Sequence, residues 1–456
     1  MSTDLLAKYN VPTPRYTSYP PANYFHEQFG AEDFREAVTA SNEKDPRHIS
    51  FYVHIPFCPR LCYYCGCNSY AMEKRSVVDA YVEALKTEIK TILPLLDKSR
   101  KIAQIHYGGG TPTAIPLHYL KEINELFLSS FRCIDEPEIA IECHPGYLNE
   151  KHWLQLVEAG FNRCSIGIQD FKEEVLRTAN RKGSLLPPAR IFELLREHDV
   201  SINLDFIYGL PGQTAAGFEE TIRQAASLRP DRLVTFSYAH VPWVNKDMLK
   251  LEKAGLPETE EKSNMYRRAA ASLSERGYVP VGLDHFVQPD DSLHVALQNG
   301  LLHRNFQGYC TRATTGQVYA FGVTAISQLA AAYSQNIRGV QEYIDKASQG
   351  ELPVMRGYVL NEQEQLAREV ITTFMCNNRL NWKELSLHIG MPVDEIMDRL
   401  AFDRHKLEEM ADDGLITYSP EEISITESGT LFIRNVAAVF DPLMRGGSEK
   451  SFSKPV

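Results

Sequence analysis

The sequence predicts an α/β protein in which a partial (β/α)6 barrel is followed by a mainly helical C-terminal domain. Two observations predict the barrel. Short β-branched or aromatic runs alternate with helical segments, and each run ends in polar residues that a purely structural strand does not need. A third observation predicts the second domain, because after about residue 353 the alternation gives way to successive helical segments and one short hairpin.

Six runs between Ile49 and about Phe286 predict the barrel strands. They are ISFYVHI at 49–55, AQIHYGG at 103–109, IAIEC at 139–143, RCSIGIQ at 163–169, INLDFIYG at 202–209 and RLVTFSY at 232–238. Between the first two, apolar residues from Val78 to Leu93 recur every three or four positions, as on one buried helix face. In a TIM-like barrel the carboxyl ends of the strands line the active site, so their polar residues are the functional candidates.

We expect three regions: an N-terminal segment at 1–48, a catalytic barrel with extensions at 49–355, and a helical domain at 356–456. The last contains helical segments at 361–376, 382–390 and 393–414 and a hairpin at 415–429, which is a winged-helix-like order. The 17 acidic and 10 basic residues of 361–456 disfavour a DNA-reading role for this domain.

Composition excludes several classes of function. The 456 residues are 43% hydrophobic and 23% charged, and no apolar run reaches the roughly 18 residues of a membrane span. The first twenty residues lack the apolar core of a secretory signal, so we expect a cytoplasmic protein that does not enter a membrane. A net charge of −11 argues against nucleic acid as the partner.

The main chemical signal is a group of cysteines. Cys58, Cys62 and Cys65 lie within eight residues, just after the first predicted strand. Soft thiolates at this spacing select an iron-sulfur cluster or zinc, and Cys67 offers a fourth ligand for zinc. The spacing C-x-x-x-C-x-x-C after a first barrel strand resembles that of radical S-adenosylmethionine (SAM) enzymes. In that interpretation the three cysteines hold a 4Fe-4S cluster whose open iron binds the amino and carboxylate groups of SAM.

Further candidates lie at other strand ends. The run Gly108–Thr113 is either an ordinary tight turn or a loop that approaches SAM closely. Glu142, Gln169, Arg181 and Asp205 offer donors and acceptors for a ribose, a carboxylate and an amine, although each residue type is more often a surface or capping residue. Tyr52 and Tyr64 either pack on SAM or fill the core. Histidines near the strand ends, His54 and His144 among them, are expected to be structural.

These residues make the chain similar to a known family, the oxygen-independent coproporphyrinogen III oxidases of haem biosynthesis, also called coproporphyrinogen dehydrogenases. The similarity runs nearly end to end. It includes Arg15-Tyr-Thr-Ser-Tyr-Pro20, Tyr52-Val-His-Ile-Pro-Phe-Cys58, Cys65-Gly-Cys67-Asn68, Gly108-Gly-Gly-Thr-Pro-Thr113, Asn162-Arg163, Gln169-Asp-Phe171, Asp205-Phe-Ile-Tyr-Gly-Leu-Pro211, Tyr238-Ala-His240, Asp284-His-Phe286 and His303-Arg-Asn-Phe-Gln-Gly-Tyr309.

The resemblance implies a radical SAM barrel, an N-terminal segment that closes the tetrapyrrole site, and two SAM molecules beside the cluster. It assigns contacts with the cluster-bound SAM to Tyr52, Gly109, Glu142 and Ile326. It assigns contacts with the second SAM to Tyr64, Gly110, Thr111, Gln169, Arg181, Asp205 and Ala239. The implied reaction converts two propionates of coproporphyrinogen III to vinyl groups through a 5'-deoxyadenosyl radical, giving protoporphyrinogen IX. The implied partners are a reduced flavodoxin- or ferredoxin-type electron donor and an unidentified acceptor, and we expect a monomer.

Two departures from the family pattern concern the second SAM and the substrate. Family members carry Asp-Pro-Arg after the glutamate, whereas this chain continues from Glu142 as Cys143-His144-Pro145-Gly146. Arg312 follows the Gln-Gly-Tyr motif and is expected to pair with a propionate. The alternatives are a related haem-degrading radical SAM methyltransferase and a non-catalytic haem chaperone. Retention of Cys67 and the Arg15–Pro20 motif favours the biosynthetic enzyme.

Overall fold

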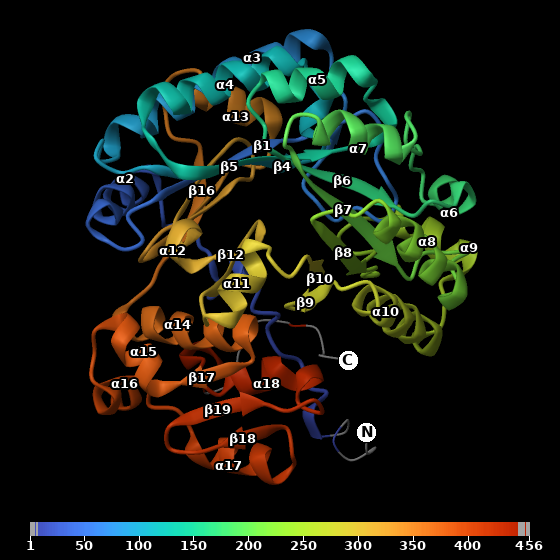
Figure 1. Cartoon of the computed structure of the whole chain (residues 1–456). Helices are drawn as coiled ribbons and strands as arrows, with labels where there is room; N and C mark the ends of the chain where they lie inside the picture. Colours follow the sequence, from blue (N-terminus) through green and yellow to red (C-terminus); the bar gives the residue numbers. More distant parts are fainter. Residues whose placement is uncertain (1–4, 6–7, 446–451, 453–456) are drawn as a thin grey trace.

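A curved sheet wrapped by helices forms the larger part of the molecule, and a smaller domain lies beneath it (Figure 1). The computed structural model describes residues 5, 8–445 and 452. Twelve strands form the sheet in the order β16-β15-β14-β13-β1-β4-β5-β6-β7-β8-β10-β9. The predicted α/β class, with a partial barrel and a helical C-terminal part, is confirmed.

The predicted strands form a continuous parallel part of this sheet. They are β1 (Ile49–Ile55), β4 (Ile102–Gly109), β5 (Cys133–Cys143), β6 (Arg163–Gln169), β7 (Ser201–Tyr208) and β8 (Arg232–Ser237). To these, β13 (Val318–Phe321) adds one more parallel strand beside β1. Adjacent strands end close together, since Ile55 lies opposite Gly109 and Cys143 opposite Ile166. This register brings the carboxyl ends, with their polar residues, to one rim of the sheet.

Helices cover the outer face of the parallel strands (Figure 1): α3 (Arg75–Ile92), α4 (Leu117–Ser130), α5 (Glu150–Glu158), α7 (Pro188–Arg196), α8 (Ala215–Ser227) and α10 (Thr259–Ser274). Helix α3 buries Val78, Leu85 and Ile89, which confirms the predicted apolar stripe. Phe51 of β1 stacks on Phe127 of α4 with ring centroids 4.3 Å apart. Full burial of one such ring stabilises the fold by roughly 2 kcal/mol.

Short strands extend both edges of the sheet. Beside β1 lies β13 (Val318–Phe321), followed by β14 (Ile326–Gln328), β15 (Ala332–Asn336) and β16 (Val354–Val359). The other edge carries β10 (His285–Val287) and β9 (Val279–Val281). Most of these runs have three to six residues, which is too short for a clear alternation of apolar and polar positions, and the sequence did not predict them.

The described part of the C-terminal domain combines five α-helices with a small sheet. The helices are α14 (Glu362–Asn377), α15 (Trp382–Ile389), α16 (Val393–Leu400), α17 (Arg404–Asp412) and α18 (Ile433–Ala438), and the sheet has β17 (Arg379–Asn381), β19 (Glu422–Ile425) and β18 (Ile416–Tyr418). The predicted single helical segment at 393–414 is wrong. Ala401 adopts a left-handed φ of 50°, Asp403 caps α17, and Phe402 turns inward to stack on Trp382. Within the described ranges, no helix has the length and apolar character needed to cross a membrane.

The N-terminal segment joins the two parts of the molecule. Tyr16 and Tyr19 donate hydrogen bonds to Asp441 near the end of the chain, at 2.8 Å and 3.1 Å. Their rings lie in the apolar core of the C-terminal domain. Helix α2 (Ala31–Ala40) then packs Phe34 and Val38 into the barrel core. The segment therefore crosses from one core to the other before β1 begins.

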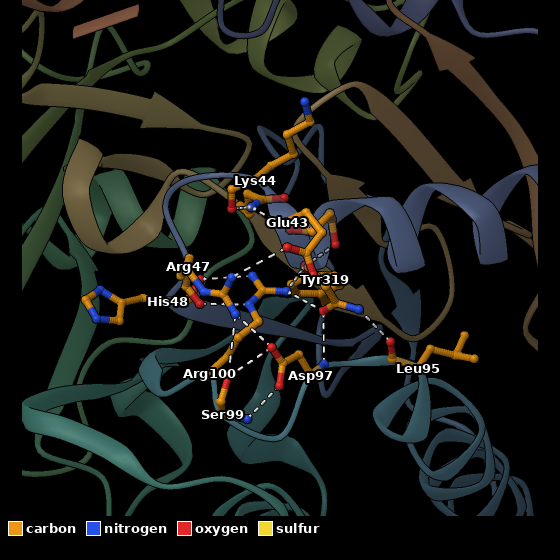
Figure 2. A network of polar contacts seen from close by, with 12 residues as sticks. Glu43, Lys44, Arg47, His48, Leu95, Asp97, Ser99, Arg100 and Tyr319 are labelled. Carbon is orange, nitrogen blue, oxygen red and sulfur yellow. Dashed lines mark hydrogen bonds and ion pairs between the residues drawn. The ribbon is translucent and has the colours of Figure 1, made fainter. Parts of the chain in front are cut away.

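A buried arginine fixes the entry to β1 (Figure 2). Arg100 is 2% exposed and donates hydrogen bonds to the carbonyl oxygens of Arg47 and His48, at 2.7 Å and 3.3 Å. The same guanidinium donates to Asn42 Oδ1 and Tyr319 Oη. A guanidinium has several donors in a fixed plane, so one side chain can satisfy several buried acceptors at once.

Candidate functional site

The three predicted cluster ligands lie in the loop that follows β1. Its first part forms β2 (Phe57–Cys58), which pairs with β3 (Tyr70–Ala71). The Cys65 amide donates to the Cys62 carbonyl oxygen at 3.2 Å and closes a tight turn. Cys58 and Cys62 are buried and Cys65 is half-buried. The structure thus brings all three thiols into one loop at the carboxyl ends of the strands.

Polar groups from three other loops contact this cysteine loop. Thr111 Oγ1, after β4, donates to Cys58 Sγ at 3.3 Å, and Arg181 Nη1 donates to Cys62 Sγ at 3.6 Å. Asn245 Nδ2, after β8, donates to the Cys65 carbonyl oxygen at 3.0 Å. Hydrogen bonds to cysteine sulfurs are among the features that set the potential of iron-sulfur clusters.

The thiols fit a cluster better than a single ion. Across the described ranges, no three His, Cys, Asp or Glu side chains converge as ligands of one metal ion. A 4Fe-4S cluster has a different requirement, since each thiolate binds a separate iron and the sulfurs stand apart around it. Burial raises the pKa of Cys58 to about 11, so ligation must displace its proton. A hydrogen bond from Cys67 lowers the pKa of Cys65 to about 6.

The glycine run allows β4 to approach the cysteine loop. A Cβ atom at Gly108 would lie 2.6 Å from Glu142 Oε1, and one at Gly109 would lie 2.7 Å from the His54 ring. Gly109 also has a φ of +115°, a conformation that disfavours other residues. A Cβ atom at Gly110 would lie 3.0 Å from Cys58 Sγ, and the Thr111 amide donates to the Phe57 carbonyl oxygen at 3.0 Å. The run is therefore more than a tight turn, because it packs the end of β4 against the cysteine loop.

Two carboxylates face the barrel interior. Glu142 on β5 remains 45% exposed at its side chain although it lies on an interior strand, so it faces an open space. Its Oε1 lies 3.4 Å from His106 Nε2. Asp205 on β7 accepts a hydrogen bond from Ser165 Oγ at 2.9 Å. Burial, with repulsion from Glu142, raises the pKa of Asp205 to about 7.

Gln169 and Arg181 lie beside these carboxylates. Gln169 ends β6 with a left-handed φ of 71°, and its Oε1 is buried with no hydrogen-bond partner among the described residues. Arg181 donates to the Gly167 carbonyl oxygen as well as to Cys62. A buried unpaired acceptor is unfavourable, so Gln169 is suited to bind a ligand donor. Tyr64 Oη is also buried, and it lies beside Cys62 and Arg181.

Tyr52 and His54 form a fixed pair on β1. His54 Nδ1 lies 3.1 Å from Tyr52 Oη, and His54 Nε2 lies 3.0 Å from the Asn68 carbonyl oxygen. A carbonyl only accepts, so Nε2 carries the proton and Nδ1 accepts from Tyr52. Burial lowers the pKa of His54, which keeps the ring neutral. Both ring nitrogens of His54 thus have protein partners, and the ring orients Tyr52.

Ala239 and Ile326 lie on opposite sides of this centre. Ala239 follows β8, next to Tyr238, whose Oη lies 3.0 Å from His240 Nδ1. Ile326 is half-buried on β14, two strands away from β1. Both side chains are apolar, so their contacts with a ligand are limited to packing and backbone atoms.

The two departures from the family pattern have distinct environments. His144 is 6% exposed, and its Nδ1 accepts a hydrogen bond from the Gly146 amide at 3.1 Å. Burial lowers its pKa to about 3, so the ring is neutral. Arg312 already contacts a protein carboxylate, that of Glu369 on α14. Its pairing with a propionate stays a prediction.

Sequence reasoning missed Asn245, whose amide contacts the cysteine loop. It lies in an irregular loop, and no motif marks it.

A cavity of about 590 Å³ was also not predicted. Arg163, Arg232 and Asp291 line it at the amino ends of the strands, opposite the cysteines. Active sites of parallel barrels lie at the carboxyl ends, so the candidate site stays with the cysteine loop.

Comparison with known proteins agrees with this geometry. A family model described as the radical SAM superfamily matches residues 52–225, which span β1 to α8. The parallel strands, the cysteine loop and the glycine run all fall in or beside that stretch. The chain is a radical SAM oxidoreductase, and enzymes of this class use a 4Fe-4S cluster and SAM.

Full-length relatives define the family. An oxygen-independent coproporphyrinogen III oxidase from Synechocystis sp. is 37% identical over 461 residues, covering 100% of this chain and 98% of the relative. The enzyme of that name from Escherichia coli is 38% identical over 97% of this chain and 95% of its own length. A solved structure of Escherichia coli coproporphyrinogen III oxidase (HemN) has a TM-score of 0.86 and 37% identity, covering 94% of this chain and 98% of that one. The chain belongs to the oxygen-independent coproporphyrinogen III oxidase family.

Proposed function

We propose that this enzyme converts two propionate side chains of coproporphyrinogen III to vinyl groups, giving protoporphyrinogen IX for haem biosynthesis without oxygen. The observation that carries the proposal is the end-to-end match with coproporphyrinogen III oxidases, which covers the barrel, the N-terminal segment and the C-terminal domain alike. A match confined to residues 52–225 would support the cofactor chemistry alone.

Cys58, Cys62 and Cys65 would hold three irons of the cluster and leave the fourth iron open. When bound, cluster and SAM supply a 5'-deoxyadenosyl radical that abstracts a β-hydrogen from a propionate. Loss of the carboxyl group as carbon dioxide would then give the vinyl group and release one electron per propionate to an acceptor. The chain itself positions the reactants and excludes water. The Thr111 and Arg181 hydrogen bonds to the thiols support this assignment.

We assign the cluster-bound SAM to Tyr52, Gly109, Glu142 and Ile326. Support comes from the fixed orientation of Tyr52 and the open space in front of Glu142. We assign a second SAM to Tyr64, Gly110, Thr111, Gln169, Arg181, Asp205 and Ala239. The unpaired Oε1 of Gln169 supports this site, since it is suited to a ligand that supplies the missing hydrogen bond.

The regions of the chain would have separate tasks. The barrel at 49–355 would perform the chemistry, while the segment at 1–48 would close the tetrapyrrole site and the domain at 356–456 would support that closure. The Tyr16 and Tyr19 contacts with Asp441 favour this division. The first of these regions begins at Met1 and the last ends at Val456, and both residues lie outside those that the structure describes.

A reduced flavodoxin or ferredoxin would supply electrons. We propose a cytoplasmic monomer, in keeping with nine free cysteines.

Deuterium transfer tests this proposal. Coproporphyrinogen III deuterated at the propionate β-carbons would be incubated anaerobically with reconstituted enzyme, reductant and SAM. We expect one deuterium in each 5'-deoxyadenosine and two such molecules per protoporphyrinogen IX. Formation of product with unlabelled 5'-deoxyadenosine would reject direct abstraction from the propionate.

A further inference from the structure

We propose that a surface formed by the loop after β8 and by α9 (Met248–Gly255) docks a small acidic protein that delivers single electrons to the cluster. We call this surface the donor face. It consists of Trp243, Val244, Lys246, Leu249, Lys250 and Lys253. The inference rests on the proposed function, because only a reductively activated cluster needs such a partner.

The centre of the donor face is apolar. Trp243 is 80% exposed, more than any other large hydrophobic side chain in the described ranges, and Val244 is 61% exposed. The loop that carries them is held in place. Met248 is buried, and its sulfur lies 3.3 Å from the Val241 amide. Asn245 donates a hydrogen bond to the Cys65 carbonyl oxygen in the cysteine loop. An exposed tryptophan on a fixed loop is typical of the residues that contribute most to binding interfaces.

The donor face lies directly beside the proposed cluster ligands. Asn245 donates to the Cys65 carbonyl oxygen at 3.0 Å. Lys250 Nζ lies 4.2 Å from the ring centroid of Tyr63, between Cys62 and Cys65 in the sequence. Leu251, on the buried side of α9, shares an apolar cluster with Tyr63. A partner bound to this face would therefore stand next to the cluster, as electron transfer between proteins requires.

The charges of the donor face select an acidic partner. Lys246 lies in the loop before α9, and Lys250 and Lys253 lie on the helix three residues apart. Lys250 pairs with Asp247 at 2.8 Å. Residues 246–253 carry three lysines against Asp247 and Glu252, so their net charge is +1, whereas the whole chain carries −11. Such charges speed the encounter with an acidic protein.

The make-up of the donor face, an apolar centre beside lysines, suits a transient complex. Electron-transfer partners bury little area and separate quickly after each encounter. One apolar centre with a charged rim is enough for such a complex. A second copy of this acidic chain could contact these lysines only through a local acidic patch. The donor face therefore fits a carrier better than a stable subunit.

Stopped-flow reduction of the reconstituted cluster tests the proposal. The two variants are Trp243→Ser and the double variant Lys246→Glu with Lys253→Glu. The reductants are a reduced bacterial flavodoxin, a reduced 2Fe-2S ferredoxin and, as a small molecule, dithionite. We expect the second-order rate constant with the better protein donor to fall about ten-fold in each variant, while the dithionite rate and dithionite-driven SAM cleavage are unchanged. The double variant should also lose the salt dependence.

Leu387→Ser is the matched control, because Leu387 is 77% exposed on α15 in the other domain. Unchanged rates with both protein donors in both variants would overturn the proposal. A loss of self-association in Trp243→Ser, with electron transfer unaffected, would assign the face to a second copy and also overturn it. Absence of dithionite-driven SAM cleavage in the unmodified enzyme would instead reject the proposed function.

Discussion

Single residues in this site are constrained by close backbone packing as much as by chemistry. The Gly109 position admits no side chain, because the His54 ring occupies the place of a Cβ. His54 in turn orients Tyr52 and holds the Asn68 carbonyl. Gly109 has no side chain, and the space that this leaves is filled by the His54 ring. Gly109 therefore fixes the positions of His54 and, through it, of Tyr52.

Replacement of Gly109 by alanine tests this constraint. The new Cβ would lie 2.7 Å from His54 and force that ring to move, so we expect SAM affinity to fall at least about ten-fold. Equilibrium binding of SAM to the reconstituted protein measures the effect. Gly160→Ala is the control, since Gly160 also has a positive φ, of 88°, but nothing lies within 4 Å of its Cβ position. Equal loss of affinity in both variants would show that backbone strain alone is responsible.

The cysteine assignment gives a second test at this scale. Serine at Cys58, Cys62 or Cys65 removes a soft ligand, so we expect loss of the cluster's visible absorbance and of bound iron. Serine at Cys67 should leave iron content unchanged, since Cys67 is not a proposed ligand. Iron analysis after reconstitution gives the answer. An equal loss of iron in the Cys67 variant would reject the three-ligand assignment.

Single elements are joined by buried polar contacts across the sheet edge. Glu88 of α3 is 2% exposed, and it accepts hydrogen bonds from the Gly322 amide at 2.9 Å and from Asn336 Nδ2 at 2.6 Å. Tyr343 also donates to this carboxylate. One carboxylate therefore ties α3 to the turn after β13 and to β15. Burial nevertheless raises its pKa to about 7.

This pKa predicts a pH dependence of stability. The unfolded carboxyl has a pKa of about 4.3, so the folded state binds the proton more tightly and its stability falls as pH rises from about 4.3 to about 7. The amide side chain of the Glu88→Gln variant does not titrate in this pH range. Relative to the variant, the unmodified protein should lose about 2 kcal/mol between pH 5.5 and 8. Urea unfolding at both pH values measures this difference, and a constant difference would contradict the raised pKa.

Elements differ in how well the sequence predicts them. The six parallel strands and α3 were predicted because their apolar periodicity is long enough to read. The strands β9, β10 and β13–β16 were missed because runs this short are stabilised by neighbours distant in sequence. The break at Ala401–Asp403 was missed for a similar reason, since Phe402 leaves the helical path to stack on Trp382.

The candidate site shows the same limit. Cys58, Cys62 and Cys65 could be named because their spacing is itself the signal. Asn245 could not, since its role depends on how the loop after β8 folds against Cys65. The contact between Arg312 and Glu369 could not be predicted either, because Glu369 comes from the C-terminal domain.

The N-terminal segment connects the apolar core of the barrel with that of the C-terminal domain. Residues 9–25 contribute to the core of the C-terminal domain, and α2 contributes to that of the barrel. The segment therefore ties the second domain to the barrel from which the cysteine loop extends. The match with coproporphyrinogen III oxidases covers both parts and the segment that joins them.

The most direct measurement of the central claim is mass spectrometry of an anaerobic assay with reconstituted enzyme, reductant and SAM. One tube contains coproporphyrinogen III and another contains haem. We expect the first tetrapyrrole to lose two carboxyl groups with formation of 5'-deoxyadenosine, and haem to remain unchanged. Methylated or ring-opened product from haem, with coproporphyrinogen III untouched, would contradict the account and identify a haem-degrading enzyme.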